Sequence, residues 1–356
     1  MGSRAGSVVS DHLAELRESA RQVVDGLGLS AGEDKTWSLI SELGWLLTTV
    51  PEQLDGLGLG IEALCQLQSE LGRGLSPAAL LPAVMTLEAV CDSDIAAKAS
   101  WIERLGGGEY VACSLAGSSL SQSGAEAGTI SGLVSAVHAA DRANLLLAWT
   151  SDENCVALLS LQQAGVELLE RATWDATRRL FDIRFSNVEL DENLVLARGD
   201  NAAVLVAKLC ALRDFAIAAD SLGGADALLS LTVEHLKMRQ QFGRPLALFQ
   251  ALKHRCADLK TQLAGAEALM QASLAKAGNQ TADDGTCLAA KKAKFLACSV
   301  FAGVAEEALQ LHGGIGMASE HPCHLFLKRA MLNEHLGSAE GGYEVQIADL
   351  EAGTWQ

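Results

Sequence analysis

The spacing of apolar residues along this 356-residue chain changes twice. Over residues 10–105 they recur at the period of a helix with one buried face. Over residues 109–199 short apolar runs, separated by Gly, Ser, Asp and Asn, predict strands instead. From about residue 201 the helical period returns and holds to residue 336. The pattern therefore predicts helical, β and helical segments in that order.

Within these segments the pattern places individual elements. A helix is expected to start at Pro77 with Ser76 as its N-cap, and the longest helix is expected to bend or break near Gly223-Gly224. The other predicted helices cover residues 11–27, 37–48, 61–71, 203–240, 248–278, 282–312 and 320–336, and the clearest strands cover 110–113, 144–149, 155–159 and 182–190. Short connections between the last long helices imply an antiparallel four-helix bundle.

We therefore expect a mostly α protein with a small β domain. Its parts are an N-terminal helical domain (residues 1–108), a middle β domain (109–199) and a C-terminal four-helix bundle (200–356). The composition, 49% hydrophobic but only 4% aromatic, is typical of such helical proteins.

The charge and the cysteines exclude several kinds of function. A net charge of −17 argues against a nucleic-acid partner, because phosphate binding needs clustered Lys and Arg. No uncharged apolar run reaches the roughly 18 residues that a membrane span needs. The amino terminus lacks the features of a signal peptide, so a cytoplasmic protein is expected. The nine cysteines are scattered without a CxxC pair, which predicts buried thiols in a reducing compartment and no metal site.

Two stretches carry the strongest functional signal, and each joins two long helical patterns. The first reads Arg239-Gln240-Gln241-Phe242-Gly243-Arg244-Pro245-Leu246, followed by Phe249-Gln250, and the second reads Ala308-Leu309-Gln310-Leu311-His312-Gly313-Gly314-Ile315-Gly316. Taken alone, the first is a helix end and a helix start, and the second is a loop. In this order and at this separation they resemble the carboxyl-terminal half of the acyl-CoA dehydrogenases. The helical, β, helical order extends that resemblance over nearly the whole chain.

The resemblance implies an FAD cofactor held across a subunit boundary. By this comparison Arg239 would pair with the pyrophosphate, a role that suits a planar guanidinium. Gln241 and Phe242 would line the adenosine part, and Leu246 and Phe249 would pack nearby. Gln310 and Gly314 would contact the same flavin from the second loop. The alternatives are a surface ion pair for Arg239 and ordinary helix packing for the apolar residues.

The family reaction also needs a carboxylate base. It removes a proton from the α carbon of an acyl-CoA thioester while a hydride leaves the β carbon for the flavin. Glu340 and the residues after it resemble the family motif, but an ungapped count from Gly313 places Gly337 at the position of the base. Some relatives carry the base on the helix before the first motif, where this chain has Arg213, which cannot accept a proton. Glu340 is either the base or a solvated carboxylate on a terminal loop.

The β domain departs further from the family. A Thr-Glu-Pro-like segment is expected after the first strand, but residues 113–119 contain neither Glu nor Pro, and no Trp-Ile-Ser/Thr segment is recognisable. The half that would surround the chain's own flavin is thus altered, while the half that would reach a neighbour's flavin is kept.

Three hypotheses follow. The chain is a subunit of an α2β2 acyl-CoA dehydrogenase that completes the site of a catalytic paralogue, with a bulky, steroid-like acyl group. It is otherwise a self-sufficient homotetramer that uses Glu340, or a non-catalytic scaffold that keeps the fold. By resemblance, the substrate would be an acyl-CoA and the electron acceptor an electron-transfer flavoprotein.

Overall fold

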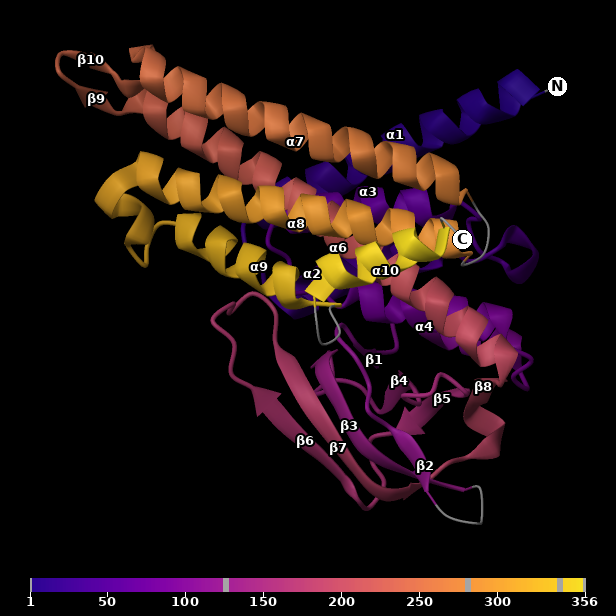
Figure 1. Ribbon diagram of the computed structural model, residues 1–356. Helices are drawn as coiled ribbons and strands as arrows, with labels where there is room; N and C mark the ends of the chain where they lie inside the picture. Colours follow the sequence, from indigo (N-terminus) through magenta and orange to yellow (C-terminus); the bar gives the residue numbers. More distant parts are fainter. Residues whose placement is uncertain (1, 124–127, 279–282, 338–341, 355–356) are drawn as a thin grey trace.

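The computed structural model describes residues 2–123, 128–278, 283–337 and 342–354. Long helices from the C-terminal half form one side of the molecule and a β-sheet forms the opposite side (Figure 1). The N-terminal helices pack against both parts. The predicted fold class, mostly α with a small β domain, is confirmed. The division into folding units at residues 108 and 199 remains a prediction.

The N-terminal part begins as the pattern predicts but differs at two helices. It contains α1 (Gly2–Leu27), α2 (Glu33–Glu42), the 3-10 turns η1 (Trp45–Leu47) and η2 (Glu52–Leu54), α3 (Gly60–Arg73), α4 (Leu80–Asp92) and α5 (Lys98–Gly106). The helix expected over residues 37–48 is split, because α2 ends at Glu42 and Gly44 has a left-handed backbone.

The predicted start of the next helix at Pro77 is wrong, because α4 begins at Leu80. The Ser76 hydroxyl does accept a hydrogen bond from the Ala78 amide. However, the Ser76 carbonyl accepts from Arg329 and the Pro77 carbonyl lies 3.1 Å from a ring nitrogen of His138. These long-range partners use the carbonyls that would otherwise begin the helical hydrogen bonds.

The β domain is built on one mixed sheet. Its strands are β1 (Val111–Ser114), β2 (Ser121–Ser123), β3 (Thr129–His138), β4 (Leu145–Trp149), β5 (Cys155–Ser160), β6 (Val166–Arg171), β7 (Leu180–Glu189) and β8 (Val195–Arg198). The order across the sheet is β6-β7-β3-β1-β4-β5-β8, with β2 paired to β3. The β1–β4 pair is parallel and the other pairs are antiparallel.

The bundle consists of four long helices. They are α6 (Asp200–Met238), α7 (Gln250–Ala277), α8 (Asp284–His312) and α9 (Cys323–His335), and a further helix, α10 (Gly342–Thr354), lies on α8. The predicted break in α6 is absent, because the helix continues through Gly223 and Gly224. These glycines serve packing instead: a Cβ on Gly223 would overlap the Ser69 carbonyl oxygen of α3, and a Cβ on Gly72 of α3 would overlap the Asp220 carbonyl oxygen. The two helix backbones therefore cross in close contact.

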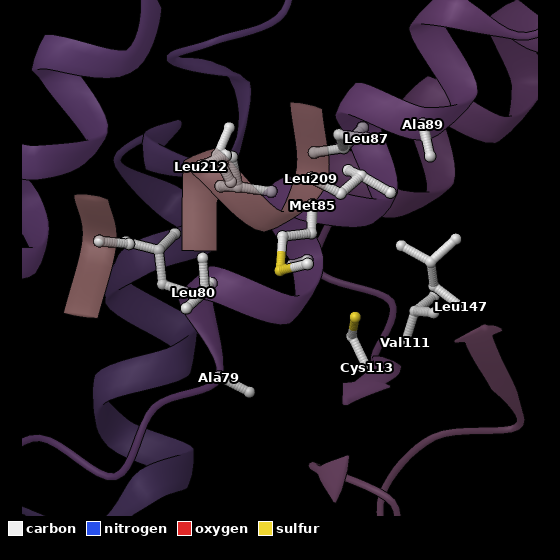
Figure 2. Close-up of a cluster of buried hydrophobic side chains, with 14 of the residues drawn as sticks. Ala79, Leu80, Met85, Leu87, Ala89, Val111, Cys113, Leu147, Leu209 and Leu212 are labelled. Carbon is white, nitrogen blue, oxygen red and sulfur yellow. The ribbon is translucent and has the colours of Figure 1, made fainter. Parts of the chain in front are cut away.

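One apolar core joins the N-terminal helices, the sheet and α6. Figure 2 shows side chains of α4, β1, β4 and α6 meeting in it. Ten of them are labelled there: Ala79, Leu80, Met85, Leu87, Ala89, Val111, Cys113, Leu147, Leu209 and Leu212. Because one face of α4 lies on the sheet and another on α6, this core fixes the sheet relative to the bundle.

A buried polar cluster joins the same three parts. Arg329 of α9 is fully buried, and its guanidinium donates to the carboxylate of Asp175, the hydroxyl of Thr177, the carboxylate of Asp220 and the carbonyl of Ser76, at 2.5–3.1 Å. Burial alone would raise the pKa of Asp220, but the nearby Arg329 and Arg178 lower it below its usual value. The carboxylate is therefore charged at neutral pH.

The described helices include none long and apolar enough to span a membrane. All nine cysteines are free thiols, and five of them are buried. Among the described residues, no group of three or more His, Cys, Asp or Glu is placed to hold a metal ion.

The close crossing of α3 and α6 makes Gly223 sensitive to substitution. Gly223→Ala should destabilise the fold by at least about 1–3 kcal/mol, because the methyl group would force the two backbones apart. Gly303→Ala, in the middle of α8 with open space around its Cβ position, should instead stabilise by about 0.5–1 kcal/mol. Urea unfolding followed by circular dichroism measures both, and equal effects would show that the crossing is not tight.

Candidate functional site

The first sequence motif folds into a short hairpin at one end of the bundle. Strands β9 (Gln240–Gln241) and β10 (Arg244–Pro245) pair antiparallel, and the turn η4 (Leu246–Leu248) leads into α7. Phe242 and Gly243 both have positive φ, 55° and 74°, as a two-residue turn of this kind requires. Phe242 pays a conformational cost for this backbone because it is not a glycine.

Aromatic and guanidinium groups stack along this hairpin. The Arg244 guanidinium lies 4.0 Å above the ring of Phe249, and Phe242 meets Phe249 edge-on with ring centroids 6.0 Å apart. Even so, 90% of Phe242 is exposed. A strained and solvent-exposed phenylalanine is typical of a surface that binds another molecule.

The second motif lies at the same end of the bundle (Figure 1). It forms the last turn of α8 and the 3-10 turn η5 (Gly313–Met317). The rings of His235, near the end of α6, and His312, at the end of α8, are 4.4 Å apart and tie the two motifs together. The fold thus brings the two motif segments to one surface.

The residues predicted to hold the cofactor differ in exposure. Two of them, Leu246 and Phe249, are half-buried. The other five are exposed: Arg239, Gln241, Phe242, Gln310 and Gly314. No described carboxylate pairs with Arg239, since the nearby Glu234 pairs with Lys237. A Cβ on Gly314 would meet nothing within 4 Å, so this chain alone does not require a glycine there. The roles of all seven stay predictions.

The second part of the candidate site lies beneath the bundle, where the two positions considered for a base meet. The Arg213 guanidinium donates to the Gly337 carbonyl at 3.2 Å and to the Ala116 carbonyl at 3.0 Å. It also donates twice to Asp214 at 3.0 and 3.2 Å. The hydroxyl of Tyr343, from α10, donates to the same Asp214 oxygen at 2.8 Å. These residues are buried and leave no free carboxylate facing Gly337.

Gly337 itself has no room for a side chain. Its φ is 75°, and a Cβ there would overlap the Tyr343 hydroxyl and lie 3.0 Å from both Arg213 and Asp214. Glu340, the other predicted base, lies outside the described residues. The structure therefore does not test its role.

Electrostatics holds this cluster in one ionisation state. Burial alone would lower the pKa of Arg213, but Asp214 more than offsets this and keeps the guanidinium charged. Burial and the Asp214 charge raise the pKa of Tyr343 far above its usual range. Lys294 is buried, lies 4.0 Å from the Tyr343 ring centroid and donates to the Glu334 carbonyl at 3.0 Å. Arg213 and Asp214 thus neutralise each other within a hydrogen-bonded packing unit, while burial lowers the pKa of the adjoining Lys294.

The segment after β1, beside this cluster, lacks the Thr-Glu-Pro-like residues that the family resemblance implies, and β1 and β3 lie in the middle of the sheet. After β1, the Ser114 hydroxyl donates to the Ser135 carbonyl and fixes the following loop. On β3, Val137 pairs with Ser114 and His138 pairs with Cys113, so the segment opposite β1 carries no tryptophan. The altered β segment of the sequence is therefore also the segment next to Arg213.

Sequence reasoning missed Tyr343 and Lys294. The chain has only two tyrosines, and a tyrosine hydroxyl usually finds a hydrogen-bond partner when it is buried. Lys294 closely follows Lys291 and Lys292 in α8, so the local pattern does not single it out. The partner of Tyr343 is 129 residues away in sequence, so no local pattern names it.

Comparison with known proteins gives a consistent relationship. Residues 10–109 match the model of the acyl-CoA dehydrogenase N-terminal domain, and residues 205–353 match that of the C-terminal domain. The acyl-CoA dehydrogenase IpdE2 of Mycobacterium tuberculosis is 31% identical over 91% of this chain and 88% of its own length.

Solved structures share the fold over nearly the whole chain. The Tcur3481–Tcur3483 steroid ACAD has a TM-score of 0.85 at 25% identity, covering 98% of this chain and 99% of that chain. The ChsE4–ChsE5 complex of Mycobacterium tuberculosis gives 0.83 at 22% identity, with 97% of each chain covered. A glutaryl-CoA dehydrogenase of Mycobacterium smegmatis, solved with FADH2, has a TM-score of 0.82 at 15% identity. The match covers 96% of this chain and 95% of that chain.

The buried Arg213 should be essential for stability. Arg213→Met should cost about 3–5 kcal/mol, because it leaves the buried Asp214 carboxylate with only the Tyr343 hydroxyl and the more distant Lys291, 3.8 Å away. Arg184→Met removes an exposed ion pair to Glu167 and should cost at most about 1 kcal/mol. Urea unfolding compares the two variants, and similar losses would contradict the described role of Arg213.

Proposed function

This chain belongs to the acyl-CoA dehydrogenase family, and we propose that it works as the subunit that completes a partner's FAD site. In this proposal the partner is a paralogous acyl-CoA dehydrogenase that supplies the catalytic base. The two together desaturate an acyl-CoA thioester between its α and β carbons.

The observation that carries the proposal is the closed position of the base. By the ungapped count from Gly313, Gly337 stands at one place from which relatives present a carboxylate, and by resemblance Arg213 stands at the other. Tyr343 fills the space in front of Gly337. A base must reach the α proton within hydrogen-bond distance. No described residue of this chain offers a carboxylate there, and we therefore assign removal of the proton to the partner rather than to Glu340, which lies outside the described residues.

The exposed end of the bundle supports the other half of the proposal. The hairpin and η5 present an unpaired guanidinium, an exposed phenylalanine and a glycine around which nothing in the chain crowds. These groups fit a flavin dinucleotide, which carries a pyrophosphate and an aromatic adenine. When bound, FAD would accept the hydride from the β carbon. Arg239 would hold its pyrophosphate and Phe242 would lie against its adenosine part.

The relatives suggest the substrate class. One structure of the same fold is a steroid ACAD, and we therefore propose a bulky, steroid-like acyl group bound mainly by the partner. An electron-transfer flavoprotein is proposed as the electron acceptor.

Two alternatives remain in view. A self-sufficient homotetramer would need Glu340 as its base, and a scaffold would bind neither FAD nor acyl-CoA in any assembly. The three readings differ in flavin content, so one purification separates them.

Assembly is the direct test. Co-expressed with a paralogous acyl-CoA dehydrogenase, the chain should copurify in an α2β2 complex with half as many FAD molecules as chains. The visible flavin spectrum and the protein concentration give this ratio. A stable homotetramer with one FAD per chain and activity alone would overturn the proposal in favour of Glu340. An assembly without flavin would favour a scaffold.

Arg239 tests the cofactor contact. Arg239→Ala should weaken FAD binding to the complex by about 2–4 kcal/mol, as expected when one partner of a charged contact is removed. Arg239→Lys should recover only part of this, because a point charge cannot make the two-pronged contact. FAD titration of the apo complex measures both. Arg184→Ala, on the exposed β6–β7 pair, is the control and should bind FAD normally.

A further inference from the structure

Three histidine rings lie in a row behind the two motif segments. The ring centroids of His235 and His312 are 4.4 Å apart, and those of His312 and His321 are 4.6 Å apart. His235 lies in the last turn of α6, just before Arg239. His312 ends α8 directly before η5, and His321 lies between η5 and α9. Each ring thus comes from a different segment at the proposed cofactor end.

The hydrogen bonds define the state of the middle ring. His312 is buried, and its Nδ1 lies 2.8 Å from the Ala308 carbonyl, to which it donates. In the neutral ring Nε2 then carries no proton, and it has no partner among the described residues. Nε2 of His235 is likewise buried without a described partner. His321 accepts at Nδ1 from the Cys323 amide at 3.3 Å.

The surroundings disfavour a positive charge on any of the rings. Burial lowers the pKa of all three. The rings lower one another's pKa as well, and Arg239 and His324 add to this at the two ends. The Cys323 thiol, 3.9 Å from His312, has its own pKa raised to about 11 by burial and stays neutral. No described carboxylate offsets these effects, so the stack is neutral at pH 7.

The stack is not arranged as a metal site, since no described group of His, Cys, Asp or Glu is placed to hold an ion. We propose that the His235–His312–His321 stack is a positioning element that sets the hairpin segment against η5 and lets them separate in acid. The inference rests on the proposed function only where it takes FAD to be the molecule that these two segments hold.

The direction of the pH effect follows from proton linkage. Once separated, each ring takes up a proton near its ordinary pKa of about 6.5, whereas the stacked rings resist protonation. The stacked arrangement is therefore fully stable above about pH 6.5. It becomes less stable as the pH falls below that value, because only the separated state gains protons.

Hydrogen–deuterium exchange on the full chain tests this without cofactor or partner. After correction for the intrinsic pH dependence of exchange, residues 240–246 and 313–317 should open about fivefold more at pH 5.5 than at pH 6.5 for each ring that takes up a proton only when separated. His312→Asn keeps a donor toward the Ala308 carbonyl but cannot titrate, so its openings should take up one proton fewer and depend less steeply on pH. If that variant does not fold, His235→Asn serves the same purpose.

The control is His254→Asn, an exposed histidine of α7 outside the stack, which should behave as the wild type. Opening that is independent of pH in the wild type would overturn the inference, as would equal pH profiles for the His312 and His254 variants. Neither result bears on partner assembly or flavin content. Conversely, a failure to copurify with a paralogue would leave the exchange result standing.

Discussion

The buried guanidinium of Arg329 is the contact on which the arrangement of the three parts depends. It reaches the N-terminal part through Ser76, the β domain through Asp175 and Thr177, and the bundle through Asp220. A buried charge is tolerated only when its hydrogen bonds and its charge are both satisfied. The three parts therefore favour one geometry, because any other arrangement takes Asp175, Thr177 and Ser76 away from the buried guanidinium and leaves it with Asp220 alone.

The end of α9 connects the contacts of Arg329 to the site around Gly337 and Arg213. One turn after Arg329, Asn333 donates to Asp220 at 2.7 Å and to Ser221 at 3.0 Å, so the last turns of α9 are fixed against α6. The chain then leaves the helix and passes over α6 at Gly337, where Arg213 holds its carbonyl. The polar cluster and the Arg213 cluster thus share α6 and α9 as a common frame. The bundle end, by contrast, projects away from this frame and keeps its polar groups exposed.

The sequence was sufficient for what depends on local pattern. The long helices, the main strands and the two motifs are found from periodicity and residue type. The hairpin at Phe242-Gly243 was not predicted, since the motif was expected to be only a helix end and a helix start. The split of the helix expected over residues 37–48 has a local cause at Gly44, but the other errors lie where distant residues decide. The Ser76-Pro77 start fails because Arg329 and His138 use its carbonyls, and Gly223 marks a helix crossing instead of a break. Tyr343 was missed for the same reason, since its role depends on Asp214.

The crowding around Gly337 bears on how such a subunit evolves. A carboxylate cannot be regained there by one substitution, because the new side chain would overlap the Tyr343 hydroxyl and would need a left-handed backbone. Replacing Tyr343 first would remove the hydrogen bond that its hydroxyl donates to the buried Asp214 carboxylate. Under the proposed function, each single step towards a carboxylate at Gly337 would therefore cost stability, and packing would favour the glycine independently of catalysis.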